Sequence, residues 1–325
     1  MNKRYILSAD IGGTHSRFGL FEFQDNDDLI IRDKIWLNTK EVNSFEELIL
    51  QLKDTAFEAL DICDITVIAV AGPVINNLFS SPPNIKWDID LRTVVSKGIL
   101  KNSYLINDFV AQAYSILTPA VRDVTKLCGP NPKDTTILSI IGAGTGLGKA
   151  MLIQKNSHIF ALPSEGGHSH FPCINRKEYE FLEFCRKKTG LLQITEDIVV
   201  SGRGIELIHY FLTNEYLSSE EITKNFKKYD KTLEWIARFY GRVCRDFALN
   251  TLCFGGLYIS GGLAARNPET IYHPCFIEEF FASEKMSHIL KQIPIYHIKN
   301  QDIGLWGAAF YGMQKLPIYP FLNTS

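Results

Sequence analysis

The chain has 325 residues, of which 46% are hydrophobic, and its formal net charge at pH 7 is -2. This length and apolar content predict a globular protein of roughly two domains, at ~150 residues per domain. The near-balanced charge, with no long run of like charge, excludes an electrostatic footprint for nucleic acid or an anionic membrane surface. We therefore expect ligands to be bound by local motifs, with no nucleic-acid partner.

Neither a leader nor a membrane span is expected. The N-terminal segment reaches Asp10 after a short apolar run, so it lacks the hydrophobic region of a signal peptide. The apolar stretch 137–153 contains four glycines and Lys149, which is typical of a turn between strands. The seven cysteines are scattered and never spaced C-x-x-C, so we interpret them as reduced packing residues. We expect a cytoplasmic protein with no membrane partner.

The first third of the chain predicts strands and then a crossing helix. An antiparallel meander is expected over 5–10, 17–23 and 29–37, with turns at Gly12-Gly13 and 24–28. Ser44 and Glu47 have the spacing of a capping box, and apolar residues from Phe45 to Leu60 follow at helical spacing. The runs 65–70 and 104–106 predict two more strands, and an apolar helical stretch follows the second.

After the loop signal at 129–132 the pattern of strand, glycine turn and strand is repeated, and the rest is mostly helical. The elements expected here are strands at 136–141 and 149–154, a strand ending near Leu162, a long helix over 231–252, strands at 257–260 and 295–298, and a closing helix over about 304–311. Two α/β lobes, each with its own sheet, are the natural packing of this order.

Two glycine-rich turns, residues 10–14 (DIGGT) and 142–148 (GAGTGLG), each follow an apolar strand. Both offer unhindered backbone N–H groups and a threonine hydroxyl, which suit phosphate oxygens. The second turn fits neither a Walker A loop nor G-x-G-x-x-G. Because another strand follows each turn, we expect two hairpins over phosphate. A tight hairpin without a ligand is an equal alternative for either turn alone, and the matched pair weakens it.

Asp10 ends the first strand beside the first turn. A carboxylate next to bound phosphates is unfavourable unless Mg²⁺ or its waters lie between them. The residue therefore predicts Mg²⁺ bound through phosphates and waters near Asp10. Taken singly, Asp10 is equally well a turn residue at a strand end.

Six motifs in order give the chain a resemblance to the bacterial-type glucokinases of the actin, hexokinase and Hsp70 superfamily, along nearly its whole length. The motifs are Ala9-Asp10-Ile11-Gly12-Gly13-Thr14 (first phosphate turn), Ile106-Asn107-Asp108-Phe109 (catalytic strand end), Gly142-Ala143-Gly144-Thr145-Gly146-Leu147-Gly148 (second phosphate turn), Pro163-Ser164-Glu165-Gly166-Gly167-His168 (sugar signature), Ser201-Gly202-Arg203-Gly204 (a further marker) and Ser260-Gly261-Gly262 (adenosine loop).

The resemblance implies an α/β, two-lobed actin-like ATPase (ribonuclease H-like) fold with an ATP and sugar cleft between a small and a large domain. The small domain would comprise residues 1–108 and about 301–325, and the large domain residues 109–300. Closure of the domains on the sugar would exclude water, which competes as a phosphoryl acceptor. The family is commonly dimeric, so a homodimer is expected.

The implied reaction is transfer of the γ-phosphate of ATP to the 6-hydroxyl of D-glucose, the first step of glycolysis, with Asp108 as general base. Without the other motifs, Asp108 is better interpreted as the N-cap of the following helix. Asn107, Glu165 and His168 are expected to hydrogen-bond sugar hydroxyls. The residues expected to bind ATP and its phosphates are Ala9, Asp10, Ile11, Gly12, Gly13, Thr14, Gly144, Thr145, Gly146, Gly261 and Gly262.

The chain departs from the family pattern at a third sugar-binding acid, which stands shortly before Ser201. An ungapped count selects Asp197 where the family usually has Glu, so either Asp197 serves with a shorter reach or Glu196 has shifted register to serve. His15 replaces the usual Asn. Arg203 replaces the usual Pro and is expected to be solvated.

Two alternatives remain open. One is a kinase for another hexose or an amino sugar on the same fold. The branch of sugar kinases with a cysteine-rich zinc motif is disfavoured because the chain has no such cluster. From another class, the chain is a non-catalytic nucleotide- or sugar-binding regulator, or an actin-like assembly module. Asp108 together with Glu165 and His168 argues against both, because a regulator does not need a base beside a sugar site.

Overall fold

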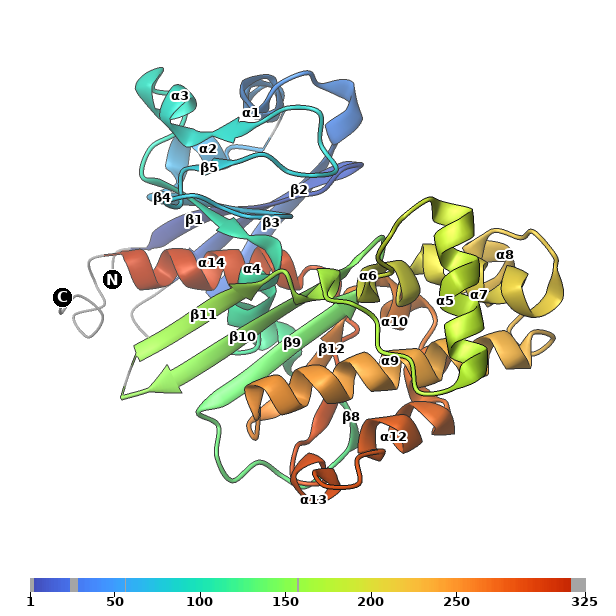
Figure 1. Cartoon of the computed structure of the whole chain (residues 1–325). Coiled ribbons are helices and arrows are strands. Elements are labelled where there is room, and N and C mark those ends of the chain that lie inside the picture. The colour runs from blue at the N-terminus through green and yellow to red at the C-terminus, as the bar shows by residue number, and fades with distance from the viewer. Residues whose placement is uncertain (1–2, 24–28, 56, 157, 317–325) are drawn as a thin grey trace. The chain divides into compact units, whose positions relative to one another are not determined.

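The computed structural model describes residues 3–23, 29–55, 57–156 and 158–316 (Figure 1). The chain forms two compact units, of which the first comprises residues 1–122, 155–163 and 302–325 and the second residues 123–154 and 164–301. The α/β class is therefore confirmed. The expected boundary at residue 108 stays a prediction, and the expected turn at 24–28 lies outside the described residues.

The sheet of the first unit has the strand order β3-β2-β1-β4-β7. Its strands are β1 (Arg4–Ile11), β2 (His15–Phe23), β3 (Leu29–Asn38), β4 (Ile65–Val70) and β7 (Ser103–Asn107). The first three pair antiparallel, which confirms the meander, and β4 pairs parallel with both β1 and β7. The short strands β5 (Phe79–Ser80) and β6 (Ile89–Asp90) form a separate pair that two-residue runs could not reveal.

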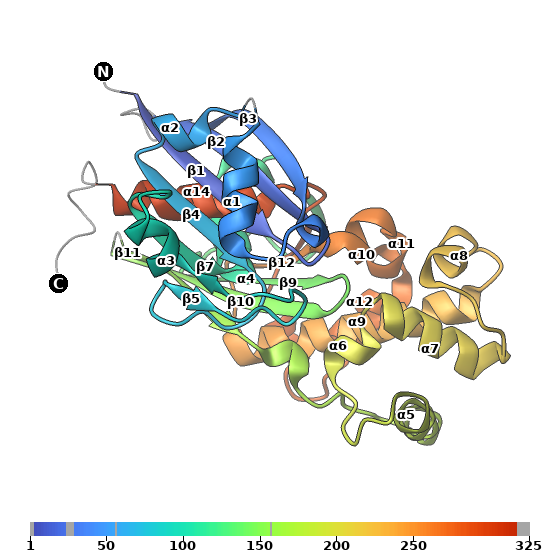
Figure 2. The same cartoon turned by 90° about the horizontal axis from the view of Figure 1, so that it is seen from above.

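The two faces of this sheet are covered by different helices (Figures 1 and 2). Alternate residues of β1, including Leu7 and Ala9, join the apolar cluster that contains α1 (Phe45–Lys53). Ile6 and Asp10 point to the other face, where α14 (Ile303–Lys315) packs. This two-residue alternation is the geometry of an extended strand. The last described helix, α14, therefore covers one face of the sheet to which the first strands belong.

The helix that follows Ser44 is shorter than the apolar pattern from Phe45 to Leu60 predicts. The structure has α1, which ends at Lys53, and a separate α2 (Ala59–Ile62). Thr55 lies between them, and its hydroxyl donates to the Leu52 carbonyl at 2.7 Å, so a side chain completes the last turn. The capping box is half formed, because Ser44 accepts from the Glu47 N–H whereas the Glu47 carboxylate accepts from the N–H of Asn43 at 2.7 Å. The first unit also contains α3 (Leu91–Ser96) and α4 (Asp108–Ser115).

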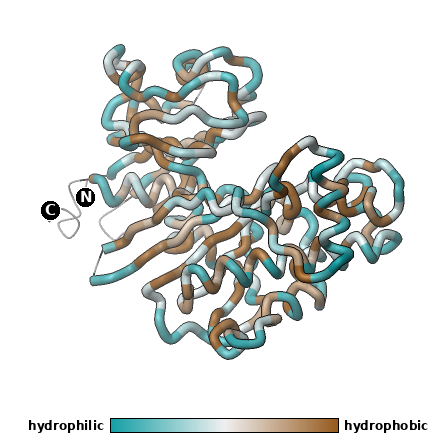
Figure 3. Tube along the Cα trace, viewed as in Figure 1, coloured by the Kyte–Doolittle hydropathy of each residue, from teal (hydrophilic) through white to brown (hydrophobic). Residues whose placement is uncertain are grey.

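A second sheet has the strand order β11-β10-β9-β12-β13-β8. Its strands are β8 (Thr125–Cys128), β9 (Ile137–Ala143), β10 (Leu147–Lys155), β11 (His158–Ser164), β12 (Gly256–Ser260) and β13 (Ile295–His297). All except β8 were expected. Strand β8 has four residues at the edge of the sheet, and its burial pattern shows no clear alternation that a sequence pattern would reveal. Figure 3 shows apolar residues gathered in these strands.

Helices make up most of the second unit, and the expected long helix is confirmed as α9 (Asp230–Thr251). The others are α5 (Arg176–Thr189), α6 (Glu196–Val199), α7 (Gly202–Thr213), α8 (Ser219–Lys224), α10 (Gly261–Arg266), α11 (Glu269–Tyr272), α12 (Pro274–Phe281) and α13 (Ser287–Leu290). Among the described helices, none combines the length and the apolar composition needed to cross a membrane.

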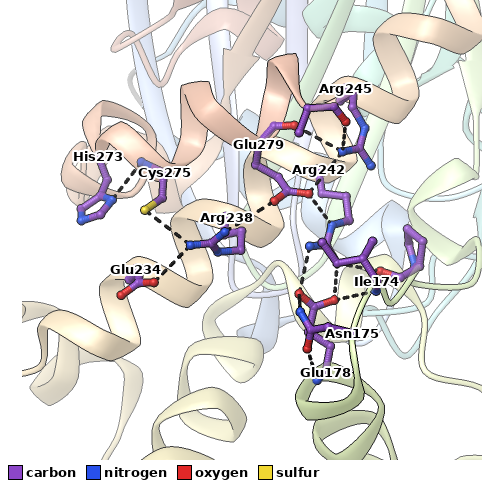
Figure 4. Close-up of polar contacts among 12 residues, drawn as sticks. Ile174, Asn175, Glu178, Glu234, Arg238, Arg242, Arg245, His273, Cys275 and Glu279 are labelled. Carbon is purple, nitrogen blue, oxygen red and sulfur yellow. Dashed lines mark hydrogen bonds and ion pairs between the residues drawn. The ribbon is translucent and has the colours of Figure 1, made fainter. Parts of the chain in front are cut away.

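A buried charged cluster ties α5, α9 and α12 together (Figure 4). The fully buried Arg242 donates to Glu178 at 2.6 and 3.0 Å and to Glu279 at 2.8 Å. It also donates to the Pro172 carbonyl at 2.9 Å, and Glu178 accepts from the N–H of Ile174 at 2.9 Å. Burial alone would lower the pKa of Arg242, but its hydrogen bonds with the two carboxylates raise it. The cation therefore anchors the segment that leads into α5.

Candidate active site

The first glycine turn is a hairpin between β1 and β2, as expected. The Gly12 N–H donates to the His15 carbonyl at 3.1 Å, and Thr14 accepts from the Thr39 N–H at 3.0 Å. A Cβ on Gly13 would lie 2.6 Å from the Asn84 carbonyl oxygen, so the position admits only glycine. The side chains of Thr14 and His15 are exposed at the tip.

Asp10 lies beside the start of α14. A Cβ on Gly304 would come within 2.9 Å of Asp10 Oδ2, so this glycine makes room for the carboxylate. Burial raises the pKa of Asp10, while Arg17, 3.8 Å from Oδ2, lowers it and Asp302 raises it again. A carboxylate in this setting is stabilised by a further cation nearby. Over the ranges that the structure describes, no group of three or more His, Cys, Asp or Glu side chains could hold a metal ion.

Asn107 and Asp108 mark the change from β7 to α4. The N-cap is Asn107, whose Oδ1 accepts from the N–H groups of Phe109 at 2.9 Å and Val110 at 3.1 Å. The interpretation of Asp108 as N-cap is therefore wrong, because Asn caps as well as Asp and only one residue can hold the position. Asp108 is the first helical residue and is half-buried. Asn107 Nδ2 also donates to the Gly72 carbonyl at 3.1 Å, which fixes its side chain.

In the second unit the sugar signature forms a loop with one 3-10 turn, Gly166–His168. The side chains of Glu165 and His168 are 51% and 66% exposed, as an open binding surface requires. His168 Nε2 lies 3.8 Å from Glu165 Oε2, and its Nδ1 lies 3.4 Å from Asp197 Oδ2. Three of the expected sugar-binding side chains are thus brought together within one unit.

The two adjacent acids of α6 have different surroundings. Glu196 is only 6% exposed and forms an ion pair with the buried Lys149. Burial raises the pKa of Glu196, and Lys149 lowers it. Asp197 is 17% exposed, accepts from the Thr195 hydroxyl and faces His168. Of the two, Asp197 is the acid that lies with the sugar signature.

The second glycine turn joins β9 and β10 and is in contact with the adenosine loop. The Gly144 N–H donates to the Gly146 carbonyl at 2.8 Å, and Gly144 accepts from the Gly202 N–H at 3.1 Å. Gly261 has φ +87°, and a Cβ there would lie 2.5 Å from the Ala143 carbonyl oxygen. The glycines of the second turn and of the adenosine loop therefore meet at the carboxyl ends of β9 and β12.

A cavity of about 550 Å³ opens beside this turn, within the size range of small-molecule sites. It is lined by Gly144, Gly202, Ile205, Ser219, Glu220, Thr223, Lys224, Leu263, Arg266 and Asn267. Sequence reasoning missed the contribution of α8, because nothing in its amphipathic pattern distinguishes it from any surface helix. Arg203 is exposed, as expected, and does not line the cavity.

The expected site residues fall into two groups. Asp10 with the first turn, Asn107 and Asp108 belong to the first unit. The second turn, the adenosine loop, the sugar signature and Asp197 belong to the second unit. In the first unit, Asp10 and Asn107 lie at the carboxyl ends of β1 and β7, which both pair parallel with β4.

Two solved structures share this fold. A glucokinase from an Antarctic psychrotroph, 24% identical, covers 96% of this chain and 99% of its own with a TM-score of 0.81. A ROK family glucokinase from Streptomyces griseus, solved in complex with glucose and AMPPNP, is 18% identical and covers 95% and 99% with a TM-score of 0.64. The two α/β units with their glycine hairpins therefore have the two-domain actin-like fold.

The particular family follows from sequence comparison. The family model described as Glucokinase matches residues 7–315, and the chain belongs to this family. The glucokinase of Nostoc punctiforme is 30% identical over 336 residues, covering 94% of this chain and 97% of its own. The resemblance inferred from the six motifs is confirmed.

Proposed function

We propose that the chain transfers the γ-phosphate of ATP to the 6-hydroxyl of D-glucose, forming glucose 6-phosphate. The proposal rests on one observation. In a chain of the glucokinase family, Asp197 lies beside Glu165 and His168 of the sugar signature. Two carboxylates and an imidazole offer directional hydrogen bonds to vicinal hydroxyls. A glucokinase of the same fold, that of Streptomyces griseus, was solved with glucose and AMPPNP, which supports both substrates.

Asp108 is the proposed general base. Phosphoryl transfer needs positioning, neutralisation of charge and a group that accepts the proton of the attacking hydroxyl. The Asp108 carboxylate would take that proton as the new oxygen–phosphorus bond forms and the β–γ bridge bond of ATP breaks. Its place in the first turn of α4, where the helix dipole favours negative charge, supports a carboxylate that is ionised before the proton arrives. Asn107 keeps one amide hydrogen for a sugar hydroxyl after donating to Gly72.

The glycine turns are the proposed phosphate sites, and the cavity beside Gly144 and Leu263 is the proposed adenosine site. The N–H groups of Gly12 and Gly144 close the two hairpins, so the N–H groups of residues 13–14 and 145–146 would bind phosphate oxygens at these turns. Asp10 is the proposed partner, through water, of the Mg²⁺ that accompanies ATP, which neutralises phosphate charge when bound. Burial raises the pKa of Asp10, so a cation bound nearby would stabilise its ionised carboxylate.

A coupled ADP-release assay tests the proposal with glucose, mannose, fructose, N-acetylglucosamine and no sugar. Glucose is expected to give the highest kcat/KM, with no release above background in the absence of sugar. A preference for mannose or N-acetylglucosamine would support the second candidate, a kinase for another hexose or an amino sugar. Asp197 favours that candidate, since its side chain is one methylene shorter than the usual Glu. ADP release with none of the sugars would contradict both.

We also propose a cytoplasmic glycolytic role and a homodimer. Both rest on the resemblance to bacterial-type glucokinases. Light scattering coupled to gel filtration tests the assembly, and a mass of about twice the 36.8 kDa chain is expected. A monomer at micromolar concentration would contradict the dimer.

A further inference from the structure

Lys149 is a buried cation that the proposed reaction does not use. It lies in β10, and its side chain is only 4% exposed. Its ammonium donates to the Glu196 carboxylate and, at 3.2 Å, to the carbonyl of Gly166. The ring of Phe247 lies 5.4 Å from the same nitrogen. A lysine with so little exposure is rare unless it is paired, and here it is paired with two different segments.

The two segments that Lys149 joins are those that carry the sugar-facing side chains. Gly166 follows Glu165 directly, and Glu196 precedes Asp197 directly. The Glu196 N–H donates to the Ser169 carbonyl at 2.9 Å, which adds a second link between the loop and α6. The buried Lys149 ammonium therefore has one acceptor in the residue next to Glu165 and another in the residue next to Asp197.

The β10 backbone itself supports the loop at the next position. A Cβ on Gly167 would lie 1.8 Å from the Leu147 carbonyl oxygen, so loop and strand are in direct backbone contact. The short helix α6 is connected to β10 through the Lys149 side chain. Removal of the ion pair would leave the loop on the strand and remove the side-chain link that sets the position of α6 and Asp197 relative to β10.

Stability alone does not explain a buried ion pair. Replacement of such a pair by apolar residues of similar volume is often neutral or stabilising, because desolvation offsets the Coulomb attraction. What the pair adds is direction, since an ammonium with three donors fixes the angle and distance between its acceptors. We propose that Lys149 and Glu196 are positioning residues that hold Asp197 at a fixed separation from Glu165 and His168, so that all three bind one sugar. This inference rests on the proposed function.

The double variant Lys149→Met/Glu196→Leu tests the inference, because it removes the charges without leaving one unpaired. We expect it to melt at or above the temperature of the wild type. We expect its KM for glucose to rise about 10- to 100-fold, as loss of orientation does, with the KM for ATP within about twofold of the wild type. The control is Arg176→Met/Glu180→Leu, which removes an exposed ion pair of the same unit (3.0 Å) and should change neither KM.

Hydrogen–deuterium exchange gives a readout that does not depend on catalysis. In the absence of sugar, residues 196–200 should exchange faster in the double variant than in the wild type, with α9 unchanged. Should the double variant not fold, Glu196→Gln takes its place, with the same direction of change and a smaller size. Unchanged exchange, an unchanged KM for glucose, or equal rises in both KM values would each overturn the inference. A wild type without glucose turnover would instead refute the proposed function, and the exchange result would still decide whether the pair positions α6.

Discussion

The two units position their polar side chains in different ways. In the first unit Asp10 and Asp108 stand at strand ends, where sheet register, the close approach of Gly304 and the Asn107 cap fix the backbone. In the second unit Glu165, His168 and Asp197 stand on a loop and a one-turn helix, supported by buried ions. A strand end needs no charged support, because the hydrogen-bond ladder already places it. A loop without a ladder depends on directional buried contacts.

The largest expected effect comes from the strand end. Asp108→Ala should lower kcat by roughly 10²- to 10⁴-fold, the range for a positioned base, while glucose and ATP still bind. The helix cap should be kept, because Asn107 accepts from the same Phe109 N–H that Asp108 accepts from. Single-turnover kinetics and calorimetric binding check this. Near-normal turnover would refute the assignment of the base.

Substitution of Arg242 in the buried charged cluster is expected to lower the stability of the second unit. Arg242→Met removes the buried cation from Glu178 and one of the arginines from Glu279, which keeps Arg245 at 3.2 Å. It should destabilise the unit by about 3–5 kcal/mol in urea unfolding. The matched control is Arg176→Met, which breaks an exposed pair with Glu180 and should change stability by less than ~0.5 kcal/mol. Equal, small losses in both variants would mean that the buried cluster supports nothing.

A sugar-facing side chain should affect binding more than chemistry. Glu165→Gln keeps the shape of the residue and removes its charge, so the KM for glucose should rise about 10-fold with a smaller change in kcat. Steady-state kinetics at saturating ATP measure the split. If the KM for glucose stayed unchanged, the interpretation of this loop as a sugar site would be wrong.

The neighbouring acids of α6, Glu196 and Asp197, should respond differently to substitution because they differ in burial. Asp197→Ala should weaken glucose binding about 10-fold at an unchanged melting temperature, because its carboxylate faces His168. Glu196→Ala should lower the melting temperature, because it leaves Lys149 buried and unpaired. Calorimetry and thermal unfolding of both variants give the comparison. Equal and small effects on glucose binding would mean that neither residue contacts or positions the sugar.

The smallest expected effect concerns Asp10 and pH. Burial raises its pKa, so the native state holds the proton more tightly than the unfolded chain does, and Asp10 opposes folding once the pH exceeds its unfolded pKa. Asp10→Asn should therefore raise the melting temperature slightly at pH 7 and lose this advantage below about pH 4. Thermal unfolding at both values tests it. The same gain at both would show that ionisation is not the cause.

Elements that depend on interactions between residues close in sequence were predicted from local patterns. Apart from β8, the strands of both sheets and α9 were predictable from apolar runs and helical spacing, and the hairpins from their glycines. The sequence could not show whether Asn107 or the neighbouring Asp108 is the N-cap of α4, because both residue types fit that position equally well. The pair of Lys149 and Glu196 is 47 residues apart in sequence. The available signal was a lysine inside an otherwise apolar strand, but its partner depends on tertiary packing.

The position of α14 has a consequence for how the chain is made. This helix packs on α4 so closely that a Cβ on Gly307 would lie 1.6 Å from the Ala111 carbonyl oxygen, and a Cβ on Gly312 would lie 2.9 Å from Ile6. Ribosomes add residues from the N-terminus, and domains generally fold as they emerge. The face of the N-terminal sheet on which α14 packs therefore stays partly uncovered until residue 315 has left the exit tunnel, after all residues of the second unit have been synthesised. During that interval the earliest strands are the part of the nascent protein most exposed to aggregation and to chaperones.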